Sequence, residues 1–543
     1  GYERDGIPWA VDGPPADFTQ ELLEPDFDHF MPLSEAAMSR TPCLAEAGIA
    51  RLVNGPEAFT PDGNCIMGPA VELDNYFVAA GFNAFGIAAG GGAGLMLADW
   101  ITRGEPGLDL WPLDIRRFGD YHRSMRYNVT RTREIYGKHY TISWPFEEHE
   151  SARGIRRSPL AGHLERRGAV FGAKYGWERP LWFAPSGVEE KDDLTFGLPN
   201  WFEHVGKEHR AVREKVAVID QSSFNKFELE GPGALSLINR IAANQMDRPP
   251  GSVIYTQLCN DRGGIEADIT VSRISLDRFF IVSGTAFGTR DRSWISRSLP
   301  SDGSVRLHDV TSAYSVLNVC GPESRSLLER ASSADLSNEA FPFACCSSIM
   351  VGCAPVRCLR ITYVGELGYE LYIPTEYACH VYETLIEAGD GRVQDAGYRV
   401  IESLRLEKGY RYWGKELTPD YTPFDAGLGF CVAMDKSEFR GKNALSEVFE
   451  RGPRWKLCCF TLNTEQPMLL HGGETICHDG NVCGVVTSGG YGYTVGRTIA
   501  YGYLSVDKAD RTEGYEIEVF RRVIPAVRHN RSLYDPGRTR ILM

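Results

Sequence analysis

Residues 255–273 read YTQLCNDRGGIEADITVSR and contain the pattern from which the fold is inferred. A Gly-Gly turn follows an acidic loop and leads into a strand whose side chains alternate in character. The two sets are Ala267, Ile269 and Val271 on one side, and Glu266, Asp268 and Thr270 on the other. Asp268 is therefore a carboxylate on a strand with an apolar opposite face, so its own face can line a pocket. For an isolated Asp, an exposed polar strand face would be the simpler interpretation.

A second hairpin with a Gly-containing turn, residues 360–374 (RITYVGELGYELYIP), favours the pocket because it occupies the equivalent place in an internal repeat. Each unit is predicted to run strand, Gly-Pro turn, helix, hairpin, helix. The predicted elements are 224–230, Gly231-Pro232, 234–241 and a helix near Trp294 in the first unit, and 314–320, Gly321-Pro322, 324–331 and 377–388 in the second. We expect each proline just inside a helix start, where its missing N–H costs nothing. Two such units facing each other would bring Asp268, Tyr363 and Glu370 to a shared central cavity.

Three stretches carry a family resemblance: GGIEADITVSR (263–273), TYVGELGYELYIP (362–374) and SLRLEKGYRYWGKELTPDYTPFDAGLGF (403–430). They resemble the folate-binding aminomethyltransferase module of the glycine-cleavage T-protein. The whole chain is similar to the C-terminal two-thirds of the sarcosine and dimethylglycine dehydrogenases, and to their relative, the pyruvate dehydrogenase phosphatase regulatory subunit. The implied fold class is mixed α/β and α+β. It comprises part of an FAD-dependent oxidoreductase domain of amino-acid-oxidase type, a duplicated α+β aminomethyltransferase-like module, and a small C-terminal β-barrel.

We expect these parts at residues 1–105 (the C-terminal part of the oxidoreductase domain), 106–195 (a connecting region), 196–445 (the folate-binding domain) and 453–543 (the barrel). Several domains suit a chain of 543 residues, 43% of them hydrophobic. The connecting region is rich in Arg and aromatic residues, which are interpreted as an interdomain surface where Arg stacks on rings. After residue 453, short strands separated by Gly and Asp turns predict a small antiparallel barrel.

Composition and charge exclude several classes of partner. A net charge of −14 argues against nucleic acid, which requires a basic surface. No apolar run reaches membrane-spanning length, since the most apolar stretch, 77–98, is broken by glycines. The 14 cysteines have neither a disulfide-framework nor a zinc-site spacing, so we expect free thiols and no metal. Gly1 stands where an initiator Met would, which predicts a processed end or a start inside a longer chain.

The oxidoreductase part is predicted from NYFVAAGF (75–82), read as a buried strand, followed by a Gly-rich turn and a helix starting at Gly86. By resemblance, this turn approaches a flavin ring. The positions carried over as cofactor-binding are Asp62, Gly81, Asn83, Gly86, Ile87 and Gly90. The family's G-x-G-x-x-G turn and flavin-attaching histidine are missing, and GGYGYTVG (489–496) reads as a hairpin. We therefore expect FAD to bind only together with the missing N-terminal half.

The second expected cofactor is tetrahydrofolate, and its site follows from the same resemblance. Asp268 is assigned as the catalytic residue, which orients the folate N10 and accepts a proton. Tyr255, Tyr363 and Glu370 match the family's pterin-contacting positions, and Glu370 is suited to bidentate hydrogen bonds from ring N–H groups. Arg405 lies on a predicted helix, 396–412, whose Val400, Leu404 and Tyr412 share one face. Arg405 is interpreted either as part of the pocket wall or as a surface Arg paired with Glu402 or Glu407.

Two functions remain open from the sequence. The first is folate-linked oxidative demethylation of sarcosine or dimethylglycine, yielding 5,10-methylenetetrahydrofolate, by an oxidoreductase of CH–NH groups in the mitochondrial matrix or, alternatively, the cytoplasm. The second is a non-catalytic truncated relative that serves as a structural or regulatory subunit of a larger assembly. The expected partners are a methylamine, folate, and an assembly or missing-half partner. A plain aminomethyltransferase is disfavoured because it would leave residues 1–190 without a purpose.

Overall fold

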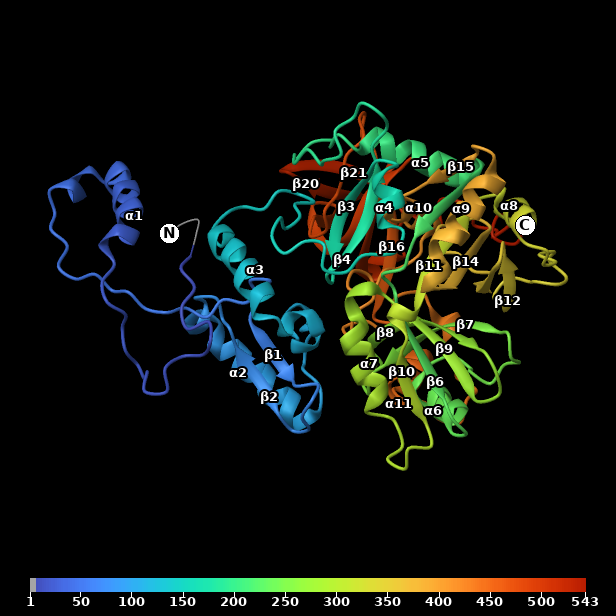
Figure 1. Ribbon diagram of the computed structural model, residues 1–543, viewed down its shortest axis with the longest axis horizontal. Coiled ribbons are helices and arrows are strands. Elements are labelled where there is room, and N and C mark those ends of the chain that lie inside the picture. The colour runs from blue at the N-terminus through green and yellow to red at the C-terminus, as the bar shows by residue number, and fades with distance from the viewer. Residues whose placement is uncertain (1–5) are drawn as a thin grey trace. The chain divides into compact units, whose positions relative to one another are not determined.

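The structure is a computed structural model that describes residues 6–543 (Figure 1). The chain divides into two compact units, residues 1–155 and 156–543, and each is considered by itself. Within the described part of the chain, no helix combines the length and the apolar character needed to cross a bilayer.

The N-terminal unit is built around a two-stranded antiparallel ribbon and a long helix. Its main elements are α1 (Phe27–Arg40), β1 (Ile66–Pro69), β2 (Phe77–Ala80), α2 (Gly86–Arg103) and α3 (Met125–Lys138). The predicted order of strand, glycine turn and helix is present in β2 and α2. The prediction of a buried strand is wrong, since β2 ends in two exposed alanines. The reason is that β2 pairs with β1 alone, so no larger sheet covers it.

The second unit opens with elements that lead into the duplicated module. They are α4 (Ala161–Glu165), the hairpin of β3 (Ala169–Lys174) and β4 (Trp177–Phe183), and α5 (Phe202–Glu214). Arg side chains stack on rings here as predicted, with the Arg156 guanidinium 4.4 Å from the Trp177 ring and that of Arg179 4.0 Å from Tyr398.

The duplication predicted from the sequence is present in the strand order of two sheets. The first half comprises β6 (Asn225–Glu230), α6 (Ala234–Ile241), β7 (Val253–Cys259), β8 (Ile265–Arg273), β9 (Arg278–Ser283) and α7 (Gly288–Ser296). The second half comprises β11 (Tyr314–Cys320), α8 (Ser324–Ala331), β12 (Cys346–Val351), β13 (Ala354–Leu359), β14 (Gly368–Pro374) and α9 (Ala378–Gly389). The neighbours run β6-β9-β8-β7 in one sheet and β11-β14-β13-β12 in the other. The first sheet is extended beyond β6 by the edge strand β10 (Arg306–Asp309). The second is extended beyond β11 by β5 (Val216–Asp220) and then by the edge strand β15 (Val393–Asp395).

The two Gly-Pro turns occupy equivalent positions, but the prolines lie before the helices and not inside them, which corrects the expectation. The helices begin at Ala234 and Ser324. Gly231 and Gly321 have φ angles of 128° and 121°, so the chain must complete a turn before helical geometry starts. A Cβ at these positions would lie 2.0 Å and 2.4 Å from backbone oxygens, so only glycine fits.

Each sheet has one face against its own helices and one face turned toward the other sheet. Ala267, Ile269 and Val271 of β8 join the core beneath α6, as the alternation predicted. The opposite faces of the two sheets share a second apolar cluster. Its buried members are Val253, Phe280 and Val282 from the first sheet, and Val316, Leu359 and Tyr372 from the second. The two facing surfaces, called here the inner faces, therefore meet, and Asp268 and Glu370 belong to them.

Beyond the module, α10 (Tyr398–Lys408) and α11 (Lys442–Arg451) lead to a closed barrel. The barrel strands are β16 (Trp455–Leu462), β17 (Thr475–His478), β18 (Asn481–Gly492), β19 (Arg497–Ser505), β20 (Tyr515–Val519) and β21 (Arg522–His529). The predicted barrel is confirmed, and GGYGYTVG forms a hairpin between β18 and β19. The predicted helix 396–412 is too long: α10 stops before Gly409, whose φ of 76° caps it, and Tyr412 lies outside.

Candidate functional site

Asp268 lies on the inner face of the first sheet within a small polar cluster. It pairs with Gln257 across β7 and β8, and the Gln257 Nε2 donates to Asp268 Oδ1 at 2.9 Å. Tyr255, two residues earlier on β7, lies on the same face and also hydrogen-bonds to Asp268. Asp268 and Tyr255 are only partly buried, whereas Gln257 is fully buried. The carboxylate is thus held by fixed donors while part of its surface stays accessible.

The environment of Asp268 brings its ionisation close to neutrality. Burial raises its pKa from 3.8 to about 6, although hydrogen bonds from Tyr255 and Gln257 and the charge of Arg411 act in the opposite direction. Desolvation therefore outweighs three interactions that favour the ionised form. A carboxylate with a pKa near 6 can accept a proton at neutral pH and release it again, as a general base requires.

Tyr363 lies near this cluster, in the loop before β14. Its hydroxyl donates to the Arg411 carbonyl oxygen at 2.6 Å, and its ring stacks on Tyr410 with centroids 5.9 Å apart. Burial raises the pKa of Tyr363, and the Asp268 carboxylate adds to that rise. The structure therefore brings together Tyr255, Asp268 and Tyr363.

Glu370 lies on β14 in the second sheet, and its hydrogen-bond partners differ from those of Asp268. The Tyr372 hydroxyl donates to Glu370 Oε2 at 2.7 Å, and Asn318 of β11 is its partner in the antiparallel register. Burial raises the pKa of Glu370, while Tyr372 and Asn318 favour its ionised form. Glu370 thus provides a second carboxylate, on the inner face opposite the sheet of Asp268.

Arg405 is buried in an ion-pair network on α10. Its Nη1 donates to Glu416 Oε2 and to the Tyr410 carbonyl oxygen, both at 3.0 Å, and its Nη2 donates to Glu402. The expected pair with Glu402 is present, but Glu407 binds Arg213 and His209 instead. Arg405 therefore fastens the 410–416 loop to α10, and its role in a pocket wall stays a prediction.

In the N-terminal unit, the predicted flavin positions divide into internal and exposed groups. Asn83 is buried, and its side chain accepts from the Thr60 N–H and donates to the Gly81 carbonyl oxygen. Asp62 forms a bidentate ion pair with Arg117, at 2.5 Å and 3.0 Å, and so has a structural partner. Gly86, Ile87 and Gly90 are exposed on the first turns of α2.

Four residues that contact these positions were missed by sequence reasoning: Gln257, Asn318, Tyr372 and Arg411. Tyr372 had a usable signal, because it follows Glu370 by two residues on a strand and must share its face. Gln257 follows Tyr255 by two residues and so must share its face, but its pairing with Asp268 had no signal, because a bulge between Leu258 and Cys259 shifts the register counted back from the Gly-Gly turn.

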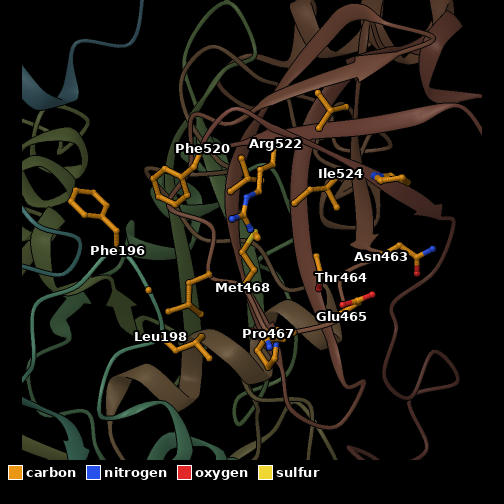
Figure 2. A pocket seen from close by; sticks show the side chains of 16 residues that line it. Phe196, Leu198, Asn463, Thr464, Glu465, Pro467, Met468, Phe520, Arg522 and Ile524 are labelled. Atoms are coloured by element: carbon orange, nitrogen blue, oxygen red, sulfur yellow. The ribbon is translucent and has the colours of Figure 1, made fainter.

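A separate groove lies on the barrel side of the second unit (Figure 2). It has a volume of about 780 Å³ and is lined from three segments, 196–198, 463–469 and 519–525. Phe196 and Phe520 meet edge to face across it, with ring centroids 5.9 Å apart. None of the predicted site residues lines this groove, so it is distinct from the polar cluster on the inner faces.

Comparison with known families agrees with this arrangement. Three family models match: FAD dependent oxidoreductase central domain at 103–158, GCVT N-terminal domain at 160–436 and glycine cleavage T-protein C-terminal barrel domain at 456–535. Fold and site thus define an aminomethyltransferase-type module that follows part of an oxidoreductase. The GCVT match covers half of the chain, and the chain belongs to the glycine cleavage T-protein family. These models also support the expected cofactors, FAD and tetrahydrofolate.

Individual relatives extend the similarity along the chain. It is 38% identical over 542 residues to 4-methylaminobutanoate oxidase (formaldehyde-forming) of Paenarthrobacter nicotinovorans, covering 99% of this chain and 65% of the relative. It is 36% identical to human mitochondrial sarcosine dehydrogenase, covering 100% of this chain and 64% of the relative, which confirms the predicted resemblance. The chain therefore spans less than two-thirds of these relatives. A solved aminomethyltransferase T from Bartonella henselae aligns with a TM-score of 0.61 at 26% identity, over 70% of this chain and 99% of that one.

Proposed function

We propose that this chain carries the folate part of an oxidative demethylation of sarcosine or dimethylglycine. The methyl carbon of the substrate would leave as a one-carbon unit and end as 5,10-methylenetetrahydrofolate. The observation that carries this proposal is Asp268, a partly accessible carboxylate with a pKa of about 6 that is held by Tyr255 and Gln257. A merely structural acid at this position would gain from full ion pairing, whereas Asp268 is held by hydrogen bonds from two neutral side chains, Tyr255 and Gln257.

The side chains on the inner faces fit tetrahydrofolate. Gln257 Oε1, Asn318 Oδ1 and Asn318 Nδ2 are buried polar atoms without a hydrogen-bond partner, beside Asp268 and Glu370. Buried polar atoms are normally satisfied, so these atoms suit a polar ligand. Glu370 would hold the amino and ring N–H groups of the pterin, and Tyr255 and Tyr363 would flank its ring. Arg405 would have no direct contact with the folate and would act by holding the 410–416 loop against α10.

Asp268 performs the chemical role in this proposal. Tetrahydrofolate, when bound, supplies the amine nitrogens that capture the one-carbon unit. Asp268 would orient N10 and accept its proton, since a pKa of about 6 leaves the carboxylate largely ionised at pH 7. The hydrogen bond from Gln257 to Oδ1 keeps the carboxylate oriented for this proton transfer.

The positions predicted to bind flavin support a second proposal, which concerns FAD. Gly86, Ile87 and Gly90 lie exposed at the start of α2, and Asn83 holds the turn that precedes them. Backbone N–H groups at a helix start suit flavin oxygens, and a Cβ at Gly90 would meet open space. We propose that Gly81 and these residues contact FAD only when another segment or partner supplies the residues that bind the pyrophosphate and ribose of the cofactor. Asp62 would stabilise the turn through its ion pair with Arg117.

A transfer assay tests the catalytic proposal. The chain is mixed with tetrahydrofolate and ¹³C-labelled formaldehyde, and the formation of the methylene product is followed against the spontaneous reaction. Acceleration by the unaltered chain, lost in Asp268→Asn, supports the proposal. A rate equal to the spontaneous rate favours the second function, a structural or regulatory subunit. A mitochondrial matrix location is proposed from human sarcosine dehydrogenase, with the cytoplasm as the alternative.

A further inference from the structure

Asn318 is an unusual residue in the second sheet. It is 1% exposed, and neither its Oδ1 nor its Nδ2 has a hydrogen-bond partner of acceptable geometry, although the amide lies close enough to Glu370 to favour the ionised carboxylate. Among the residues that the structure describes, no other buried side-chain amide has both polar atoms unpartnered. Burying an unpaired amide destabilises a folded protein, so a position that keeps one calls for an explanation.

The position of Asn318 indicates what it faces. It pairs with Glu370 on β14 and, on its other side, with Ile219 on β5. Ile219 belongs to a core cluster against which Tyr363 packs. Tyr372, next but one to Glu370, packs against the first sheet, which places Asn318 on the inner face. Asn318 therefore lies between Glu370 and the cluster of Tyr363, two residues of the proposed folate site.

Chemistry then selects the group that Asn318 would bind. Glu370 accepts hydrogen bonds, so it suits the adjacent N–H groups of a 2-amino-4-oxopteridine ring. The atoms on either side of those N–H groups, the ring carbonyl oxygen and a ring nitrogen, are both acceptors. The Asn318 amide carries two N–H donors and stands beside the carboxylate, so it can donate to an acceptor next to the group that Glu370 holds.

We propose that Asn318 is a specificity-determining residue that donates a hydrogen bond to the pterin end of the folate, and that it is retained at a cost to stability. This inference rests on the proposed function. It makes a prediction that a structural role would not: replacing Asn318 by an apolar residue of similar size should weaken ligand binding and at the same time stabilise the ligand-free protein.

Three variants of the 543-residue chain provide the test: Asn318→Leu, Asn318→Ala in case leucine prevents folding, and Asn338→Leu as the matched control. Asn338 is exposed in the same half of the module and accepts from Arg325. The ligands are tetrahydrofolate, 6-methyltetrahydropterin as the pterin end, and p-aminobenzoylglutamate as the other end. Calorimetry gives Kd, and thermal unfolding without ligand gives Tm.

We expect Asn318→Leu to raise the Kd of tetrahydrofolate and 6-methyltetrahydropterin roughly tenfold or more, the size of one buried hydrogen bond. Its Tm should rise by roughly 2 °C or more, and p-aminobenzoylglutamate and Asn338→Leu should show no change. Unchanged pterin affinity in both Asn318 variants, or a lowered Tm for Asn318→Leu, overturns this inference alone. If the unaltered chain binds no tetrahydrofolate, the proposed function fails and this inference fails with it.

Discussion

Replacing Gln257 by leucine tests how the ionisation of Asp268 is set. The change keeps the size of the side chain and removes the 2.9 Å hydrogen bond from Nε2 to Asp268 Oδ1. A hydrogen bond to a charged group stabilises by about 1.5 kcal/mol or more, and 1.36 kcal/mol corresponds to about one pKa unit. Since Gln257 favours the ionised carboxylate, the pKa of Asp268 should rise from about 6 to about 7.

The assay is the pH dependence of one-carbon transfer in a single turnover. The acid limb of the profile should move about one unit toward alkaline pH, and at pH 6 the ionised fraction should fall from about one half to about one tenth. Gln394→Leu makes the same change at an exposed position on β15 and should leave the profile unaltered. An acid limb that stays in place in Gln257→Leu would refute the reasoning, because either Asp268 is not the base or Gln257 does not control it.

Four further outcomes are expected. Asp268→Asn should slow transfer by roughly 10²-fold with tetrahydrofolate still bound. Its Tm should exceed that of the unaltered chain above pH 6 and not at pH 4, because a carboxyl whose pKa is raised from 3.8 to about 6 stabilises the fold below 3.8 and loses that stabilisation as pH rises through 6. Glu370→Gln should mainly weaken folate binding, which calorimetry would show as a raised Kd, with little change in the rate of one-carbon transfer at saturating folate. The purified chain should show at most weak flavin absorbance, and a stoichiometric yellow chromophore would contradict the proposed need for a second contributor.

Much of the fold could be predicted because glycine and apolar periodicity mark it locally. The strand, Gly-Pro turn and helix order recurs in both halves, and α6, β11 and α8 match the predicted boundaries. The placement of Pro232 and Pro322 before the helices could not be predicted, because the sharp turn depends on backbone contacts with Ser304 and Lys215, which lie far away or on another element.

The sequence predicted site residues whose own side chains have the required chemistry, such as Asp268. It did not predict residues that reach the site only through the pairing of strands. Alternation on β8 placed Asp268 on a polar face, as observed. The pairing of Gln257 with Asp268 depends on a β-bulge that has no signal in the sequence. Asn318 lies opposite Glu370 only because β11 is the neighbour of β14 in the sheet. Long-range pairing of this kind is decided by the whole sheet, which explains why these two amides were missed.

The central claim is that the inner faces of the duplicated module bind tetrahydrofolate between Asp268 and Glu370. Calorimetric titration of tetrahydrofolate into the folded 543-residue chain tests it most directly, with the Asp268→Asn, Glu370→Gln double variant as the comparison. We predict one saturable site per chain, with affinity strongly reduced in the double variant. Absence of binding by a chain that circular dichroism shows to be folded, or equal binding by the double variant, would contradict the claim.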